Sequence, residues 1–170
     1  MPFFQKLQSE DLTENRRAEK VVIVGVGNLL LKDEGVGVHV AHKLQKMALA
    51  PGVEVFDGGV AGIGLLDFFQ EAGKVLLIDA ADMNLEPGAV VRFTPEDIRF
   101  QSGELRLSAH DVGVMEVLEL AKALGQCPSE VVIIGIQPKE ISWGTDLTPE
   151  VEASIPRVVE MVLREIDQPG

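Results

Sequence analysis

The stretch KVVIVGVGNLLLKDEGVGVHV, residues 20–40, joins a run of β-branched residues to a helical pattern through a glycine-rich turn. A continuous β-branched run is typical of a strand that is buried on both faces. The turn opens like a dinucleotide-binding loop, but Leu30 stands where the third glycine of G-x-G-x-x-G is required. Two carboxylates, Asp33 and Glu34, precede the helix instead. The stretch therefore predicts a strand–helix unit whose loop is not built around a phosphate.

Strand-like runs alternate with helical patterns along the rest of the chain. Further strands are predicted at residues 53–57, 74–81, 89–93 and 130–137, and helices at 35–49, 62–72, 110–124 and from Thr148 to Ile166, the last kinked at Pro156. Such alternation is typical of an open α/β sheet with helices on both faces. Only a short turn separates the predicted strands 74–81 and 89–93. We therefore expect one antiparallel pair and a mixed sheet. The length of 170 residues fits one domain over 20–167, preceded by a polar N-terminal extension over 1–19.

The formal net charge is −12, from 15 basic and 27 acidic side chains. This balance argues against a nucleic-acid binder, since Lys and Arg supply most of the affinity for phosphates. No apolar run reaches the ~18 residues of a membrane span, and the first residues lack the apolar segment of a signal peptide, so we expect a cytoplasmic protein without a membrane partner. Cys127 is the only cysteine, which excludes an internal disulfide and a Cys-rich metal site.

Polar residues follow the carboxyl ends of the predicted strands, where open α/β folds bind their ligands. They are Asp33 and Glu34 after the first strand, Asp57 at the second, Asp79 and Asp82 at the third, Gln137 at the last, and His110 at a helix start. Each also has a structural interpretation. Asp33 can cap the following helix, Glu34 can interact with the helix dipole, and Asp57 before two glycines is common in turns. His110 can be an ordinary helix-start residue.

Asp79 is the hardest of these residues to explain structurally. It follows an apolar strand directly, so it should be buried, and an unpaired buried charge is costly. A metal ion would supply a partner for such a charge. Glu34, Asp79 and His110 offer two carboxylates and an imidazole, a set suited to zinc, nickel, manganese or iron. Three protein ligands with open positions are typical of a working site rather than a structural one.

Other kinds of site are missing from the sequence. It contains no H-E-x-x-H, no G-x-S-x-G and no G-x-x-x-x-G-K-[ST]. His39 and His42 lie three residues apart on the first helix, and without a third ligand nearby we interpret them as surface or packing residues. The glycine-rich segment DGGVAGIG, residues 57–64, has no Lys or Arg to meet a phosphate. It fits better as a flexible loop that lets a peptide backbone approach the site.

Four motifs occur in order: GVGNLLLKDEGVG from residue 25, DGGVAGIGLL from 57, VLLIDAAD from 75 and SAHDVG from 108. Over about residues 20–165 the chain resembles the maturation endopeptidases of nickel-iron hydrogenases. The resemblance implies a three-layer α/β/α sandwich around a twisted, mostly parallel sheet of about five strands in a single domain. It also implies an endopeptidase, filed with the aspartic-type endopeptidases, that removes the C-terminal extension of a hydrogenase large-subunit precursor after nickel insertion.

The resemblance assigns metal binding to Glu34, Asp79 and His110, and a place in the cleft to Asp57. The nickel is expected to arrive on the precursor, and zinc or cadmium could replace it in a crystal. In one hypothesis, docking of this nickel positions the scissile bond. In another, the metal polarises the carbonyl or generates the attacking hydroxide. Asp79, Asp57 and Glu34 are the candidate catalytic carboxylates, with Asp79 or Asp57 as general base. Family members are mostly monomers, so a monomer is expected.

Two other classes of function stay open from the sequence. The same three ligands would serve a non-enzymatic nickel-binding chaperone for hydrogenase assembly. The glycine loops could instead belong to a nucleotide-binding module. The missing third glycine, the lack of Lys near the turns and the acidic charge weigh against that module.

Overall fold

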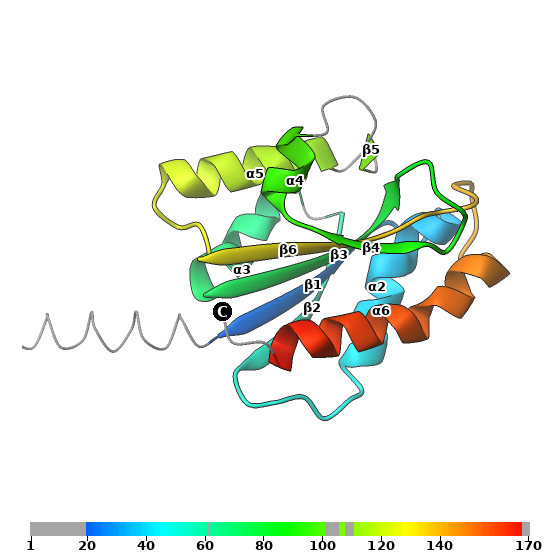
Figure 1. Cartoon of the computed structure of the whole chain (residues 1–170), viewed down its shortest axis with the longest axis horizontal. Helices are drawn as coiled ribbons and strands as arrows, with labels where there is room; N and C mark the ends of the chain where they lie inside the picture. The colour runs from blue at the N-terminus through cyan, green and yellow to red at the C-terminus, as the bar shows by residue number, and fades with distance from the viewer. Residues whose placement is uncertain (1–19, 61, 101–105, 108–110, 168–170) are drawn as a thin grey trace, which may run out of the picture.

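The computed structural model describes residues 20–60, 62–100, 106–107 and 111–167. A sheet in the order β2-β1-β3-β6-β4 forms its centre (Figure 1). Neighbouring strands are parallel except β4, which runs antiparallel to β6, and the short β5 pairs antiparallel with the end of β3. The strands are β1 Val21–Val26, β2 Val53–Gly59, β3 Lys74–Asp82, β4 Val90–Phe93, β5 Arg106–Leu107 and β6 Glu130–Ile136.

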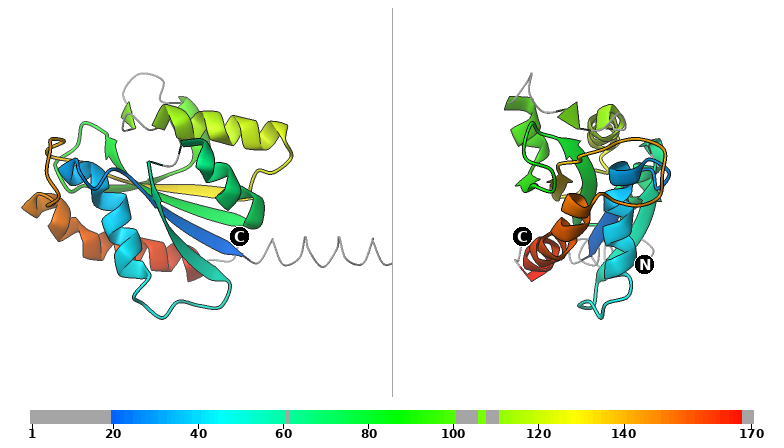
Figure 2. Two further views of the ribbon diagram at one scale, coloured as in Figure 1. Left: turned by 180° about the vertical axis from the view of Figure 1, so that it is seen from behind. Right: turned by 90° about the vertical axis from the view of Figure 1, so that its right-hand side faces the viewer.

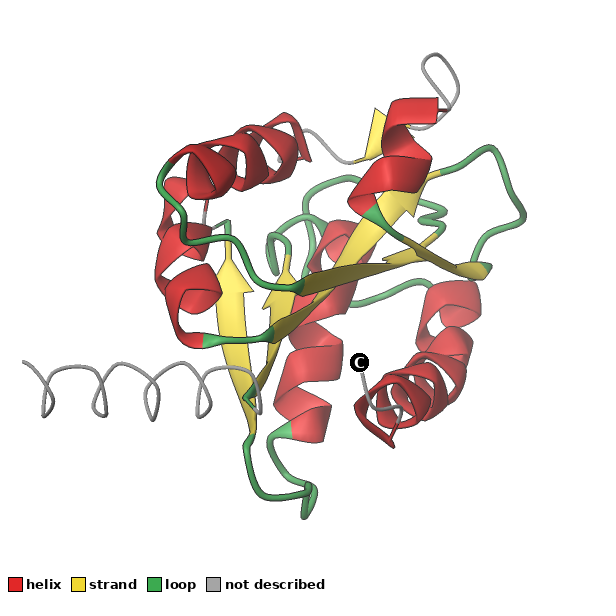
Figure 3. Ribbon diagram, turned by 60° about the vertical axis from the view of Figure 1, so that its left-hand side comes forward, coloured by secondary structure: helices red, strands yellow, loops and turns green. Residues whose placement is uncertain are grey.

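Helices cover both faces of the sheet (Figure 3). One face carries α2 and α6, and the other carries α3 and α5 (Figure 1). The helices are η1 Lys32–Gly35, α2 Val36–Leu44, η2 Gly62–Gly64, α3 Leu65–Glu71, α4 Pro95–Phe100, α5 Asp111–Ala123 and α6 Pro149–Asp167. The predicted three-layer sandwich in a single domain, with a mostly parallel but mixed sheet, is confirmed.

The two apolar cores lie on opposite sides of the central strands. Along β3, Val75 and Leu77 face the α3/α5 layer, whereas Leu76 and Ile78 face the α2/α6 layer. Consecutive side chains of a strand point to opposite faces, so a strand covered on both sides must be apolar at every position. This explains the unbroken apolar runs in the sequence.

The antiparallel strand was expected, but its partner is β6 and not β3. Val90 pairs with Ile136 and Phe93 with Ile133. Two backbone hydrogen bonds extend the ladder beyond β6, from Gly88 N to the carbonyl of Gln137 and from Gln137 N to the carbonyl of Ala89. The chain leaving β3 therefore crosses the end of β6 before it turns back.

Three elements, η1, α4 and β5, were not predicted, and all are short. The last helix, α6, continues unbroken through Pro156. The predicted extension over residues 1–19 lies outside the described residues. Among the described helices, none is long and apolar enough to cross a membrane.

A partly buried ion-pair cluster fastens α6 to the end of the sheet where β3 and β6 begin and the antiparallel β4 ends. Glu165 of α6 accepts hydrogen bonds from Lys74 of β3 and Arg92 of β4. Lys74 also pairs with Glu130 of β6, at 3.2 Å between Nζ and Oε1. Burial raises the pKa of the Glu165 carboxyl, but the hydrogen bonds and positive charges of Arg92 and Lys74 outweigh it, so the pKa is lowered. The charged cluster stands at the end of the sheet opposite the predicted site.

Candidate functional site

The strands β1, β2, β3 and β6 are parallel, so their carboxyl ends share one edge of the sheet. The right-hand view of Figure 2 looks onto this edge, where η1 and the loop between β6 and α6 lie side by side. Glu34 in η1 and Asp79 near the end of β3 are both buried, each with about 4% of its surface exposed. The chain thus places two of the predicted ligands inside the molecule, at the edge where such folds bind ligands.

The glycines of the first loop bring η1 and α2 unusually close to the sheet. A Cβ atom on Gly37 would overlap the carbonyl oxygens of Ile78 and Val26. Gly27 has a φ of 141°, and a Cβ there would overlap the carbonyl oxygen of Glu34. The glycine-rich pattern therefore serves helix–sheet contact. It seats the segment with Glu34 against the end of β3, where Asp79 follows Ile78.

Asp79 belongs to the face of the sheet that α3 and α5 cover. It alternates with Val75 and Leu77, which face that layer. Its Oδ1 accepts the backbone N–H of Ala80 at 2.8 Å, which fixes the orientation of the carboxylate. The helix α5 in the same layer begins at Asp111, the residue after the third predicted ligand. That ligand, His110, lies outside the described residues.

Asp33 has a different role from the predicted helix cap. No side-chain cap bond starts η1. The fully buried carboxylate instead accepts the backbone N–H groups of Lys139, Glu140 and Thr148, at 2.9, 2.9 and 2.7 Å, and the hydroxyl of Thr148. Burial raises the pKa of the Asp33 carboxyl, yet these hydrogen bonds outweigh it and hold the pKa below its ordinary value. Asp33 therefore clasps the β6–α6 loop against the segment that carries Glu34.

Asp57 lies at the same edge but is oriented toward the other layer. Its Oδ2 lies 2.7 Å from Nε2 of His42, on α2, and its Oδ1 accepts the N–H of Gly59 at 2.9 Å. Both side chains are partly exposed. The sequence had placed His42 among surface or packing residues, and only the fold reveals its contact with Asp57. By strand alternation Asp57 faces the α2 side, whereas Asp79 faces the α5 side.

Gln137, at the end of β6, organises the neighbouring β3–β4 loop. Its Oε1 accepts the N–H groups of Met83 and Leu85, and its Nε2 donates to Oδ1 of Asp82. Within the described part of the chain, no group of three or more His, Cys, Asp or Glu side chains could hold a metal ion. The predicted ligand set of Glu34, Asp79 and His110 includes a residue outside that part of the chain.

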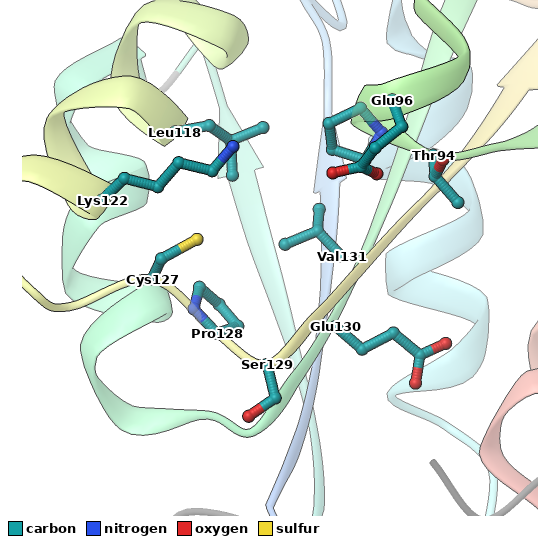
Figure 4. Close-up of a pocket in the computed structure, with 10 residues that line it drawn as sticks. Thr94, Glu96, Leu118, Lys122, Cys127, Pro128, Ser129, Glu130 and Val131 are labelled. Carbon is teal, nitrogen blue, oxygen red and sulfur yellow. The ribbon is translucent and has the colours of Figure 1, made fainter.

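A separate hollow of about 240 Å³ opens at the other end of the sheet. Lys122 and the half-buried thiol of Cys127 line it, together with Ser129 and Glu130 at the amino end of β6 (Figure 4). Ligands of open α/β folds bind beyond the carboxyl ends of strands. This hollow is therefore not the predicted site.

The fold and the site define an α/β protein that presents buried carboxylates, instead of a phosphate loop, at its ligand-binding edge. A family model described as hydrogenase maturation protease matches residues 38–165. The chain belongs to the hydrogenase maturation protease family, and it is a peptidase by that membership.

Individual relatives agree with this assignment. The chain is 39% identical, over 142 residues, to the hydrogenase expression/formation protein HoxM of Cupriavidus necator, covering 82% of this chain and 70% of HoxM. Its structure is similar to the hydrogenase maturating endopeptidase HybD of Escherichia coli, with a TM-score of 0.80, 30% identity and coverage of 89% and 94%. The HybD maturation protease of Thermococcus kodakarensis gives a TM-score of 0.74 at 30% identity, with coverage of 87% and 99%.

Proposed function

We propose that the chain is an endopeptidase that removes the C-terminal extension of the large-subunit precursor of a nickel-iron hydrogenase after nickel has been inserted. The nickel travels with the precursor and is recognised by Glu34, Asp79 and His110. The observation that carries the proposal is the burial of Glu34 and Asp79 at the carboxyl edge of a sheet whose loop lacks the means to bind phosphate.

The chemistry of the donor set supports recognition of nickel. Carboxylate oxygens and an imidazole nitrogen suit divalent nickel and zinc. The free-energy cost of burying two carboxylates near each other is reduced when a cation neutralises them. The close seating of η1 on β3 supports the pairing of Glu34 with Asp79, and the start of α5 in the layer that Asp79 faces supports the addition of His110.

Recognition makes cleavage conditional on the metal. A precursor that carries nickel gains ligands from the three side chains, and its scissile bond is then held beside the carboxylates. In peptide hydrolysis a water oxygen adds to the carbonyl carbon, a base accepts the water proton, and the C–N bond breaks as the amine takes up a proton. We assign the base to Asp79, because it is buried at the carboxyl edge with Glu34, whereas Asp57 is exposed and its Oδ2 contacts His42 on the α2 side.

The test compares purified protein on two substrates, the nickel-loaded precursor and the same precursor without nickel, with the mass of the large subunit measured over time. We expect a loss of mass for the loaded precursor only. Glu34→Gln and Asp79→Asn should slow cleavage by about 10²–10⁴-fold. Glu152→Gln, an exposed position on α6, is the matched control and should cleave normally.

Three outcomes would contradict the proposal. Equal cleavage of the precursor without nickel would show that the protein does not recognise nickel. Full activity of both Glu34→Gln and Asp79→Asn would show that these residues do not belong to the active site. Binding of the loaded precursor without any loss of mass would identify a nickel-dependent assembly chaperone instead of a peptidase.

A further inference from the structure

Most of the large apolar side chains that are exposed among the described residues belong to loops at the carboxyl edge of the sheet. Trp143, the only tryptophan of the chain, is 80% exposed. Ile141, on the same β6–α6 loop, and Leu30, on the β1–η1 loop, are each at least half exposed. We call these three residues the apolar rim.

The two loops that carry the rim are joined by backbone hydrogen bonds. Leu31 and Gly144 form a parallel bridge, in which Gly144 N donates to the carbonyl of Leu30 at 3.0 Å and Lys32 N donates to the carbonyl of Gly144 at 2.9 Å. Leu30 and Trp143 each precede a paired position, so their backbones lie side by side. The buried carboxylate of Asp33 holds the same loop on both sides of Trp143, at Lys139 and at Thr148. The rim is therefore exposed on a fixed support.

Two cations beside the rim are each paired with a carboxylate. Lys32 Nζ lies 2.6 Å from Oε1 of Glu140, and Lys139 Nζ lies 2.5 Å from Oε1 of Glu150. The chain as a whole carries a net charge of −12. Neither of these lysines is left as a free positive charge, so the rim offers large apolar side chains and not a basic patch, which favours an apolar partner over a strongly charged one.

We propose that the apolar rim docks an apolar segment of the protein substrate next to the bond that is cut. The proposal rests on the proposed peptidase function and adds a specificity surface to it. The rim is continuous with the site, since Leu30 lies just before the η1 segment that holds Glu34, and Asp33 of η1 ties this segment to the loop with Trp143. The occupant is a stretch of the nickel-loaded precursor with large apolar side chains, which the rim holds while the carboxylates engage the metal.

The physical basis is that a rigid, exposed aromatic surface binds at low entropic cost. Tryptophan is enriched among the residues that dominate binding energy in protein interfaces. A support that is already ordered spends no free energy on loop ordering when the partner arrives. The rim thus contributes to capture of the precursor and has no part in bond cleavage.

The test measures KM and kcat for the nickel-loaded precursor, together with the Kd of the complex. Trp143→Ser should raise KM and Kd roughly tenfold or more and leave kcat within about twofold. Leu30→Ser should act in the same direction. Leu124→Ser is the matched control, because Leu124 is as exposed as Leu30, at 54%, but follows α5 away from this edge. All three variants should keep the melting temperature of the unaltered protein.

Failure of the rim can be distinguished from failure of the peptidase. If the unaltered protein cleaves and Trp143→Ser leaves KM and Kd unchanged, the rim proposal is wrong and the peptidase stands. If the unaltered protein binds the precursor without cleaving it and Trp143→Ser weakens binding, the rim stands and the peptidase fails. If Trp143→Ser only dissolves a dimer of the chain, with precursor affinity unchanged, the rim is a self-association surface and the proposal is overturned.

Discussion

Substitution of Asp33 by Asn removes the clasp between the first loop and the β6–α6 loop. In Asp33, Oδ1 accepts the N–H of Thr148 and Oδ2 accepts the N–H groups of Lys139 and Glu140, while the Thr148 hydroxyl lies 3.1 Å from Oδ1 and 2.8 Å from Oδ2. Asn keeps a single acceptor oxygen. If that oxygen stays with Thr148, the new amide NH₂ faces two N–H donors and both bonds are lost.

The expected loss of stability follows from those two bonds. A hydrogen bond to a charged group contributes about 1.5–3 kcal/mol. Because Lys139 and Glu140 are exposed residues that water can reach, the lower figure applies to each bond, and Asp33→Asn should cost about 3 kcal/mol in the free energy of unfolding. Loss of an ordinary helix cap would cost only about 1 kcal/mol.

The assay is urea unfolding followed by circular dichroism, with Asp146→Asn, an exposed position on the same loop, as the control. Thr148→Val removes the hydroxyl but keeps the backbone donor, so about 1 kcal/mol should be lost. A cost below about 1 kcal/mol for Asp33→Asn would refute the clasp and restore the cap interpretation.

Three further predictions concern other parts of the molecule. Glu165→Gln should lower the free energy of unfolding by about 2 kcal/mol at pH 7, the cost of breaking a buried ion pair reduced by the pairs that remain. The folded-state pKa of Glu165 lies below its ordinary value of 4.5, so this stabilisation is present above pH 4.5 and disappears as the pH falls through the folded pKa. A difference in the free energy of unfolding between the two proteins that persists unchanged at low pH would contradict this prediction. Gly37→Ala should destabilise the fold by more than 2 kcal/mol, because the added Cβ has no space. Gly125→Ala, with open space but a φ of 67°, should cost about 1 kcal/mol. Equal costs of the two variants in thermal unfolding would show that the close approach at Gly37 is not what forbids a side chain. In the cleavage assay Asp79→Asn should lose activity while Asp57→Asn keeps at least a tenth of it, and the reverse order would move the general base to Asp57.

The strands and most helices could be predicted because their signals are local. β1, β3 and β6 are buried on both faces, so they appear in the sequence as unbroken apolar runs. The buried residues of α2 recur at helical spacing. The elements that were missed, η1, α4 and β5, are too short to show a period. The partner of β4 depends on a chain crossing that no local pattern encodes.

The site was only partly predictable, because its contacts join distant segments. The candidate carboxylates Glu34 and Asp79 could be found from their positions after strands, and burial of Asp79 follows from the apolar run before it. The partners of Asp33 lie more than a hundred residues away in the chain, so its role as a clasp could not be read from neighbouring residues. The contact between His42 and Asp57 likewise needs the pairing of β1 with β2 and the seating of α2.

The central claim is that Glu34, Asp79 and His110 converge on one divalent ion. The most direct measurement is anomalous diffraction at the nickel edge from crystals of the protein soaked in nickel, with cadmium as a second probe. We expect a single peak about 2.0–2.2 Å from an oxygen of each carboxylate and from an imidazole nitrogen of His110. A well-occupied peak elsewhere on the molecule, with these three side chains turned toward different partners, would contradict it.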